Sequence, residues 1–266
     1  YLSFWLSSLE ATPELHVFHN IKYEIDEDIL EELDEPLEQI IEDELRQKVN
    51  AYLPRLGSST KITIGQESST IGALVDFVKR QKCDLTVFGK KLDIEGSGIT
   101  TSRFLRQNQS SVLVVPSKTR KSFTNLCVPI DFSKHSAAAL KVGLELADRG
   151  DATLTPLHVY HVPQVYFPYI PVKPVLKAKP DKAEEQYLEF LEEYFLHYHN
   201  LECTFYDGHD QTIVKSIASF SRDKKMDLII LGLKGESAFI GSVAIGLSES
   251  ELRIPLLFIK YDSVTR

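Results

Sequence analysis

The segment GLKGESAFIGSVAIGLS, residues 232–248, is the part of the sequence whose residue types and spacing could bind an anion. It follows the apolar run DLIIL and carries glycines at positions 232, 235, 241 and 246. Glycine is a poor helix former, but because it has no side chain it lets backbone amides approach a phosphate. The helix that follows would attract the same phosphate with its positive N-terminus. The alternative is that these glycines only turn the chain between a strand and a helix.

The elements that would position this segment occur twice in the chain. LHVFH at residues 15–19 parallels LHVYH at residues 157–161, an offset of 157 − 15 = 142. CDLTVFG at residues 83–89 parallels MDLIILG at residues 226–232, an offset of 226 − 83 = 143. Matched segments in one order at a nearly constant offset indicate a duplicated unit. We assign residues 1–116 to a first repeat, the polar and basic residues 117–124 to a linker, and residues 125–266 to a second repeat.

In the second repeat, continuously apolar runs alternate with helical patterns, which indicates a parallel sheet covered on both faces. Ser133 is a suitable N-cap and Gly150 a suitable end for the first of these helices. Residues 162–180 are predicted to form a proline-rich loop, which either packs over its own domain or contacts another copy. The other expected elements are strands at 125–131, 152–160, 201–207, 227–232 and 255–260 and helices at 181–198 and 210–225. Each repeat is thus predicted to be a doubly wound α/β domain with a five-stranded parallel sheet.

The first repeat lacks its opening strand in this sequence. Subtracting the offset from residues 125–131 places that strand between 125 − 142 = −17 and 131 − 142 = −11, before Tyr1. We therefore expect residues 1–9 to be the second half of a helix. We also hypothesise about 20 further N-terminal residues, the length of a strand plus half a helix.

Composition limits the class of protein. The 266 residues are 43% hydrophobic and 26% charged, which is typical of a soluble globular protein. A formal net charge of −8 and a pI near 5.5 argue against nucleic-acid binding. No apolar stretch approaches the ~18–20 residues that span a bilayer, and the opening YLSFWLSSL lacks the marks of a signal peptide. The cysteines at 83, 127 and 203 have no metal-type spacing and favour a reducing cytoplasm.

Several stretches resemble the universal stress protein family. LCVPIDFSKHSAAALKVGLELADRGDATLTPLHV resembles the opening of such a domain, and DLIILGLKGESAF together with IPLLFIK resembles its end. In the first repeat, CDLTVFGKKLDIEGSGITTSRFLRQNQSSVLVVP resembles the same end. The resemblance covers nearly the whole chain in tandem. It implies the strand order 3-2-1-4-5, pairing of the two domains through their last strands, and the adenine-nucleotide binding that is frequent in the family.

The resemblance also implies where a nucleotide would lie in the second repeat. Asp131 stands where the family's aspartate faces the nucleoside, and the alternative role for this residue is to cap the following helix. Backbone groups near Val159, after the second strand, would flank the base.

The glycine segment matches the family's phosphate-binding pattern only in part. ATP-binding members carry Gly, two residues, Gly, nine residues, Gly, and then Ser or Thr. Gly232 and Gly235 match, but ten residues separate Gly235 from Gly246. Without an insertion, Ile245 takes the third glycine position, where a branched side chain would crowd a phosphate. The candidates to supply the missing hydroxyl are Ser242 and Ser248.

The first repeat keeps less of this pattern. Gly89 matches, Leu92 replaces the second glycine, and Ser102 with Arg103 occupies the last positions. Gly-Ser-Gly at residues 96–98 could instead form an anion-binding nest, with the basic residues Lys90, Lys91 and Arg103 nearby. We predict that the second repeat binds adenine nucleotide weakly or not at all, and that the first does not bind it in the family's usual mode.

No other constellation points to catalysis or to a metal. His158 and His161, at the end of a strand, are expected to point to opposite faces of the sheet. His197 and His199 are two residues apart near a helix end and would point away from each other, so neither pair predicts a metal site. The sequence holds no Gly-x-Ser-x-Gly elbow and no Walker A lysine motif. We therefore expect no catalytic residue and no metal.

The pattern favours a cytoplasmic tandem universal stress protein that acts as a sensor or scaffold in a stress response. Two alternatives stay open: a slow ATP hydrolase or other nucleotide-processing enzyme on the same fold, and a structural interaction module with decayed pockets. The expected partners are the two domains for each other, through their last strands, and a second copy in a homodimer; neither nucleic acid nor membrane is expected. The residues predicted to hold ATP or another adenine nucleotide are Asp131, Val159, Gly232, Gly235, Gly246 and Ser248.

Overall fold

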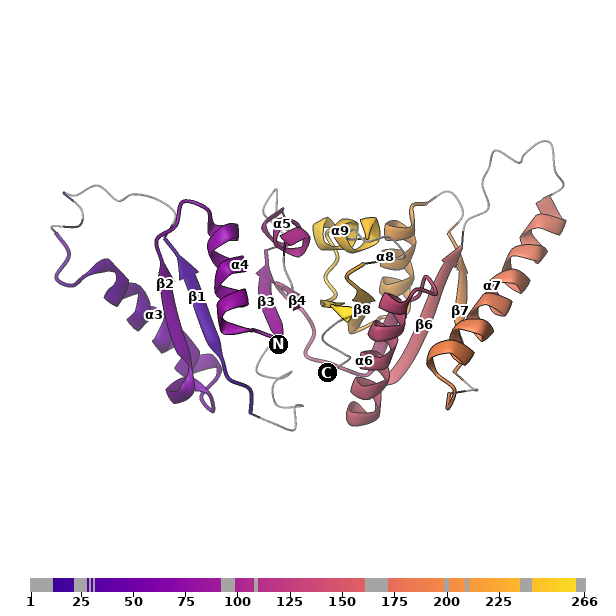
Figure 1. Cartoon of the computed structure of the whole chain (residues 1–266), viewed down its shortest axis with the longest axis horizontal. Coiled ribbons are helices and arrows are strands. Elements are labelled where there is room, and N and C mark those ends of the chain that lie inside the picture. Colours follow the sequence, from indigo (N-terminus) through magenta and orange to yellow (C-terminus); the bar gives the residue numbers. More distant parts are fainter. Residues whose placement is uncertain are drawn as a thin grey trace. The chain divides into compact units, whose positions relative to one another are not determined.

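The computed structural model describes residues 12–21, 28, 30, 32–91, 99–107, 110–160, 172–198, 201–208, 211–234 and 241–261, and of residues 58 and 172–180 it describes the backbone only. The chain forms two compact units, Tyr1–Lys82 (unit 1) and Cys83–Arg266 (unit 2), which are treated separately (Figure 1). This division does not coincide with the linker predicted at 117–124, and the repeat boundary stays a prediction from the sequence. None of the helices in the described part of the chain has the length and apolar character to cross a bilayer.

The described part of unit 1 is a parallel strand pair with helices. β1 (His16–Asn20) pairs with β2 (Lys61–Gly65). α3 (Leu37–Tyr52) begins directly after Pro36, because a helix start does not need the N–H that proline lacks. The remaining elements are the 3-10 helix η1 (Gly57–Ser59) and α4 (Thr70–Gln81).

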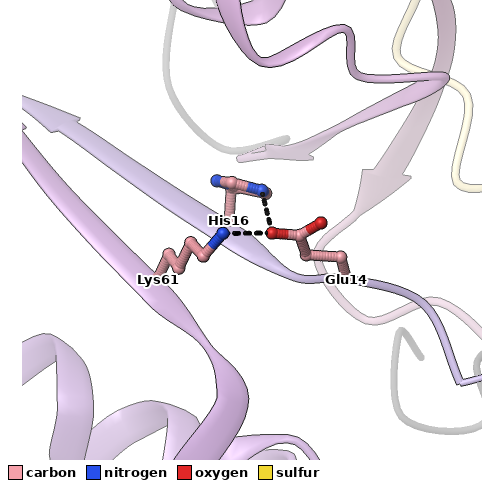
Figure 2. Close-up of polar contacts among 3 residues, drawn as sticks. All are labelled: Glu14, His16 and Lys61. Carbon is pink, nitrogen blue, oxygen red and sulfur yellow. Dashed lines mark hydrogen bonds and ion pairs between the residues drawn. The ribbon is translucent and has the colours of Figure 1, made fainter.

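Glu14 links the starts of both strands of unit 1 (Figure 2). Its carboxylate accepts a hydrogen bond from Lys61 at the start of β2 and lies 3.2 Å from Nε2 of His16 in β1. The hydrogen bond from Lys61 lowers the pKa of the Glu14 carboxyl. Because both Glu14 and Lys61 are exposed, water screens this pair and it contributes little to stability.

Unit 2 is built on a seven-stranded sheet in the order β3-β4-β9-β8-β5-β6-β7. All neighbours run parallel except β4 and β9, which pair antiparallel. The second repeat supplies the run β7-β6-β5-β8-β9, which is the order 3-2-1-4-5 when its strands are numbered along the chain. The strands are β3 (Leu85–Lys90), β4 (Ser111–Pro116), β5 (Asn125–Pro129), β6 (Thr153–Tyr160), β7 (Thr204–Asp207), β8 (Leu228–Gly232) and β9 (Leu256–Ile259).

The second repeat has the predicted five parallel strands, and β4 and β9 form the pairing through the last strands that the resemblance implies. The prediction of a second parallel sheet for the first repeat is wrong for β3 and β4, which this pairing places in one mixed sheet with the second repeat. β4 ends the first repeat and β9 ends the second, and their pairing places β3 and β4 in the same sheet as the second repeat, while β1 and β2 form a sheet of their own. The physical reason is the apolar character of both strands. Leu113 and its partner Leu257 are at most 3% exposed, and an unpaired edge would place such residues in water.

The helices of unit 2 cover both faces of the sheet. α6 (Lys134–Gly150) has Ser133 as its N-cap, as predicted, and packs on β5, β6 and β8. α8 (Ile213–Asp223) packs on β6 and on α9 (Ser242–Glu249), and α9 also contacts α5 (Ile99–Gln107). Right-handed crossovers that run in opposite directions along a sheet place their helices on opposite faces. α6 and α9 therefore cover different faces.

α7 (Val172–Tyr194) begins inside the segment predicted to be a proline-rich loop. Pro174 lies in its first turn, where the missing N–H has no cost, but Pro180 lies in its interior. Buried residues such as Tyr187 and Phe190 give this helix a packed face, and packing decides helix formation more than local propensity does. The predicted loop is thus wrong from residue 172 onward, and residues 162–171 lie outside the described residues.

Candidate functional site

The carboxyl ends of β5, β6 and β8 meet where the strand order of unit 2 reverses. β5 lies between β6 and β8, and the chain passes from β5 to β6 on one side and later returns to β8 on the other. In open parallel sheets this point forms a crevice lined by the loops that follow the strands. Asp131, Val159 and Gly232, three of the residues predicted from the sequence, lie at this edge.

Asp131 holds Ser133, the N-cap of α6, in place. Its Oδ1 accepts hydrogen bonds from the backbone N–H of Ser133 at 3.2 Å and from the Ser133 hydroxyl at 2.6 Å. The same hydroxyl oxygen accepts from the N–H of Ser136 at 3.2 Å. The Asp131 side chain is exposed, and its Oδ2 makes no hydrogen bond to the residues the structure describes. One oxygen thus serves the helix cap and the other remains available to a ligand.

Phe132 and His158 hold the turn that carries Asp131. Phe132 has φ 63°, a left-handed conformation that bulky residues rarely adopt. Its ring stacks on the His158 imidazole, with centroids 4.4 Å apart and 21° between the planes. Nδ1 of His158 lies 2.9 Å from the carbonyl oxygen of Ile130, to which the neutral ring donates. Because burial lowers the pKa of His158, the ring stays neutral at neutral pH, and the stack offsets the unfavourable φ.

The backbone of Val159 extends past the end of β5. The β5–β6 pairing ends with Pro129 opposite Leu157, whose carbonyl accepts from the N–H of Ile130 at 2.8 Å. Alternate residues of a parallel strand face the same neighbour, so Val159 directs its N–H and C=O to the same side as Leu157 does. These groups therefore point to the region beyond β5, where Asp131 lies. A flat heterocycle could use both of them.

Gly232 has a packing reason to be glycine. A Cβ at this position would lie 2.8 Å from the carbonyl carbon and oxygen of His135, in the first turn of α6. The missing side chain therefore lets α6 cross the end of β8 closely. This contact favours the interpretation that Gly232 serves chain packing, and it also brings the N-terminus of α6 to the crevice.

Gly246 and Ser248 are occupied in helix packing within α9. A Cβ at Gly246 would lie 2.7 Å from a methyl group of Val214 in α8. Ser248 is fully buried, and its hydroxyl donates to the carbonyl of Ile245 at 2.7 Å. The structure therefore does not bring these two residues to the crevice with Asp131, and Gly235 lies outside the described residues.

Sequence reasoning missed a cluster at the start of α6. Nζ of Lys134 lies 5.1 Å from the centroid of the Tyr261 ring, within the range of a cation–π contact. The His135 ring meets the same tyrosine edge-on, with centroids 5.5 Å apart. Lys134 and His135 open the helix, where unpaired N–H groups attract anions. The motif FSKHS indicates a helix start, but no local signal predicts Tyr261, which follows the last strand.

Lys90, one of the cations predicted to lie near an anion nest in the first repeat, is bound to carbonyl groups instead. Lys90 is 5% exposed, and its Nζ donates to the carbonyl oxygens of Ser248, at 2.7 Å, and of Ser250. Residues 96–98 lie outside the described residues. In the described ranges, no three His, Cys, Asp or Glu side chains come together in a way that could hold a metal ion. Of the histidines considered for a metal site, His161 and His199 fall outside those ranges.

Comparison with known proteins gives one family and several solved structures. Residues 122–250 match the model of the Universal stress protein family. A universal stress protein from Archaeoglobus fulgidus DSM 4304 is 14% identical, with a TM-score of 0.62 over 97% of this chain and 90% of that one. A functionally unknown protein from Pseudomonas aeruginosa PAO1 is 16% identical, with a TM-score of 0.60 over 95% of this chain and 84% of that one.

One further structure is similar to about half of the chain. It is a universal stress protein in complex with cAMP, 19% identical, with a TM-score of 0.35 over 51% of this chain and 96% of that one. Comparison with curated proteins gives no match.

Proposed function

We propose that this chain, of which residues 122–250 match the Universal stress protein family, is a tandem member of that family. In this proposal it is a cytoplasmic stress-response sensor or scaffold, and its second repeat binds an adenine nucleotide weakly. The proposed site is the carboxyl edge of unit 2, at Asp131, Val159 and Gly232. Binding, rather than turnover, is the proposed activity, because the described residues of the crevice offer no positioned base and no carboxylate cluster for Mg²⁺.

Asp131 is the observation that carries this proposal. Its Oδ1 is held by Ser133, which orients the carboxylate, and the side chain is exposed at the carboxyl edge of the sheet. A carboxylate oxygen fixed in this way suits the hydroxyl groups of a ribose, because hydrogen bonds to a charged acceptor are strong. The N–H and C=O of Val159 provide a donor and an acceptor beside it for the edge of an adenine ring.

The phosphates of this nucleotide would lie at the start of α6. Lys134 supplies a positive charge there, and the helix N-terminus adds its dipole. Gly232 keeps the end of β8 free of a side chain at the same place.

Two features explain why the binding would be weak. The N–H groups of Ser133, which precedes α6, and of Ser136, in its first turn, are already bonded to side chains of the protein, so fewer amides remain there for a phosphate. In addition, Gly246 and Ser248 are packed within α9 and unavailable as the later part of a phosphate loop.

Isothermal titration calorimetry of the full chain with ATP tests this function. Asp131→Asn keeps an oxygen that can accept hydrogen bonds from Ser133 but removes the charge, and it is expected to weaken ATP binding about tenfold or more. Asp148→Asn, on an exposed position of α6, is the matched control and should leave the affinity unchanged. Equal affinities for the natural protein and Asp131→Asn would contradict the proposed site. Stoichiometric release of phosphate from bound ATP would contradict binding without turnover.

A further inference from the structure

α7 carries its charges in an order that a single helix disfavours. Residues 172–183 include four lysines and one aspartate, whereas residues 184–194 include five glutamates and no basic residue. The first turn has no acidic residue and the last turn has no basic one, although α4 and α6 both end in basic residues. Because the N-terminus of a helix is positive and its C-terminus negative, the charges of α7 oppose its own dipole. Their order therefore does not stabilise α7 within one copy.

The outer face of α7 is exposed at the end of unit 2 that carries β6 and β7 (Figure 1). The inner face is packed, because Tyr187 and Phe190 are buried and the helix lies on β6. On the outer face, Leu188 is 58% exposed. Position 177, a lysine, lies 188 − 177 = 11 residues or about three turns earlier, so the helix backbone places it on the same face. None of the ion pairs among the described residues involves α7. The exposed carboxylates of this outer face are those of Glu185, Glu189 and Glu192.

Two copies of α7 complement each other when they run antiparallel. In a two-fold pair that overlaps along the whole helix, residue 172 lies opposite residue 194, and any residue i lies opposite residue 366 − i, since 172 + 194 = 366. The lysine-rich half of each copy then meets the glutamate-rich half of the other. A parallel pair would instead oppose like charges along its whole length. The opposed pairs of unlike charge in the antiparallel register are Lys173 with Glu193, Lys177 with Glu189, and Lys182 with Glu184.

The same register also covers the exposed apolar residue of the outer face. Leu188 lies opposite Ala178 of the second copy, which replaces water with an apolar neighbour. Asp181 and Glu185 form the one opposed pair of like charge, and because both positions are exposed, water screens their repulsion. Attraction therefore outweighs repulsion in this register.

We propose that the outer face of α7 is the surface through which two copies of this chain associate, antiparallel and about a two-fold axis. A partner of one charge sign fits less well, because a basic partner would meet the lysines of residues 172–183 and an anionic surface would meet the glutamates of residues 184–194. The helix has 23 residues at a rise of about 1.5 Å each, so the contact is about 35 Å long. Because its charges lie at an exposed surface, this dimer is weak and depends on salt.

Sedimentation velocity of the full chain over a series of protein concentrations tests this proposal. A dimer is expected at about 0.1 M salt. Its dissociation constant is expected to rise at least about tenfold at about 1 M salt, where the Debye length has fallen from about 10 Å to about 3 Å. A chain that stays monomeric at low salt up to its highest soluble concentration overturns the proposal. A dimer that high salt leaves unchanged or tightens overturns it as well.

Reversing two glutamates of the proposed contact should weaken the dimer. Glu189→Lys combined with Glu193→Lys places cations opposite the lysines of the second copy, and because the pair is two-fold symmetric, four opposed pairs change. The dissociation constant at low salt should rise at least about tenfold. The net charge changes from −8 to −8 + 4 = −4, which by itself would favour association. The new lysines also follow the order that the helix dipole favours, so a loss of dimer does not come from a weaker helix.

Two further variants separate the contact from other causes. Adding Lys173→Glu and Lys177→Glu to the first variant reverses both halves of the helix and should restore the dimer, because the halves are complementary again. Glu145→Lys combined with Asp148→Lys makes the same change of net charge as the first variant at exposed positions of α6, and it should leave the dimer intact. The proposal is contradicted if the first variant still forms the dimer, if the fourfold variant fails to restore it, or if the α6 control weakens it equally.

Discussion

Nζ of Lys90 donates a 2.7 Å hydrogen bond to the carbonyl oxygen of Ser248, so that a side chain of the first repeat closes the C-terminal end of α9 in the second. The last carbonyl groups of a helix have no partner within the helix, and a buried cation there satisfies them and favours the helix dipole. Burial lowers the pKa of the Lys90 ammonium, and the nearby Glu249 and Glu251 oppose that shift. Lys90 therefore joins the two repeats within unit 2 rather than serving an anion site.

Replacing Lys90 should destabilise unit 2. Lys90→Ala removes the donor from the carbonyl oxygens of Ser248 and Ser250 and leaves a cavity, for an expected loss of about 1–3 kcal/mol in the free energy of unfolding. The exposed neighbour Lys91 provides the control, and Lys91→Ala should change that free energy by less than about 0.5 kcal/mol. Urea titration measures both. Equal stabilities for the two variants would contradict this role of Lys90.

The buried His158 makes stability depend on pH. Its pKa is lowered in the folded protein, mainly by burial, so the unfolded chain binds the proton more readily. The free energy of unfolding should therefore fall as pH decreases below about 6.5, the ordinary histidine pKa, until the folded protein is protonated as well. His158→Gln keeps a donor for the Ile130 carbonyl but does not titrate, and it should reduce this dependence.

Urea titrations at pH 7 and pH 5 give the required comparison. One proton contributes at most about 1.4 kcal/mol per pH unit. His197→Gln, at an exposed position, should retain the dependence of the natural protein. A variant lacking His158 that loses as much stability in acid as the natural protein would show that other groups cause the effect.

Gly232 should matter for both stability and nucleotide binding. Gly232→Ala places a methyl group against the backbone of His135, which cannot move as easily as a side chain, and should cost about 1–3 kcal/mol. Because this shift displaces the start of α6, ATP affinity should also fall. Gly143→Ala, which crowds Val128 and Leu154 beneath the middle of α6, should cost stability alone. Unfolding measurements and ATP titration of both variants separate the effect on stability from the effect on binding. If Gly232→Ala, titrated to saturation, binds ATP with unchanged affinity, the ligand lies elsewhere.

Cys127 should be unreactive in the native protein. Burial raises the pKa of this thiol to about 12, and it raises the pKa of the Cys203 thiol to about 12 as well. Since the thiolate is the reacting form, iodoacetamide at pH 8 should alkylate neither residue until the protein is unfolded. Mass spectrometry of the labelled peptides measures the extent of alkylation. If Cys127 of the folded protein is alkylated as fast as in the unfolded chain, the residue is not buried.

Elements with local signals could be predicted from the sequence. α6 is the clearest example, because an N-cap at Ser133 and a helix end at Gly150 bound an apolar pattern of helical period. α7 shows the limit of such signals. Proline rules end a helix at Pro180, yet α7 runs through it, and the described buried residues of this helix, such as Tyr187, all follow the proline. No local signal therefore predicts the turns before Pro180.

The positions of the candidate site residues in the fold were predictable where they depend on strand ends, and not where they depend on contacts between distant segments. Asp131 follows an apolar strand, and the repeat and the resemblance place it at the crevice. The packing of Gly246 against Val214 has no local signal, because residue counts along α9 do not say which helix lies beside it. The same holds for Gly232 and His135, which the fold of unit 2 brings together from separate elements.

A crystal structure of the full chain grown with saturating ATP tests the central claim most directly. The account predicts electron density for the nucleotide at the carboxyl edge of unit 2, with a ribose oxygen within hydrogen-bond distance of Oδ2 of Asp131 and the adenine ring beside the backbone of Val159. Nucleotide bound at another place, or an empty crevice at saturating ATP, would contradict it.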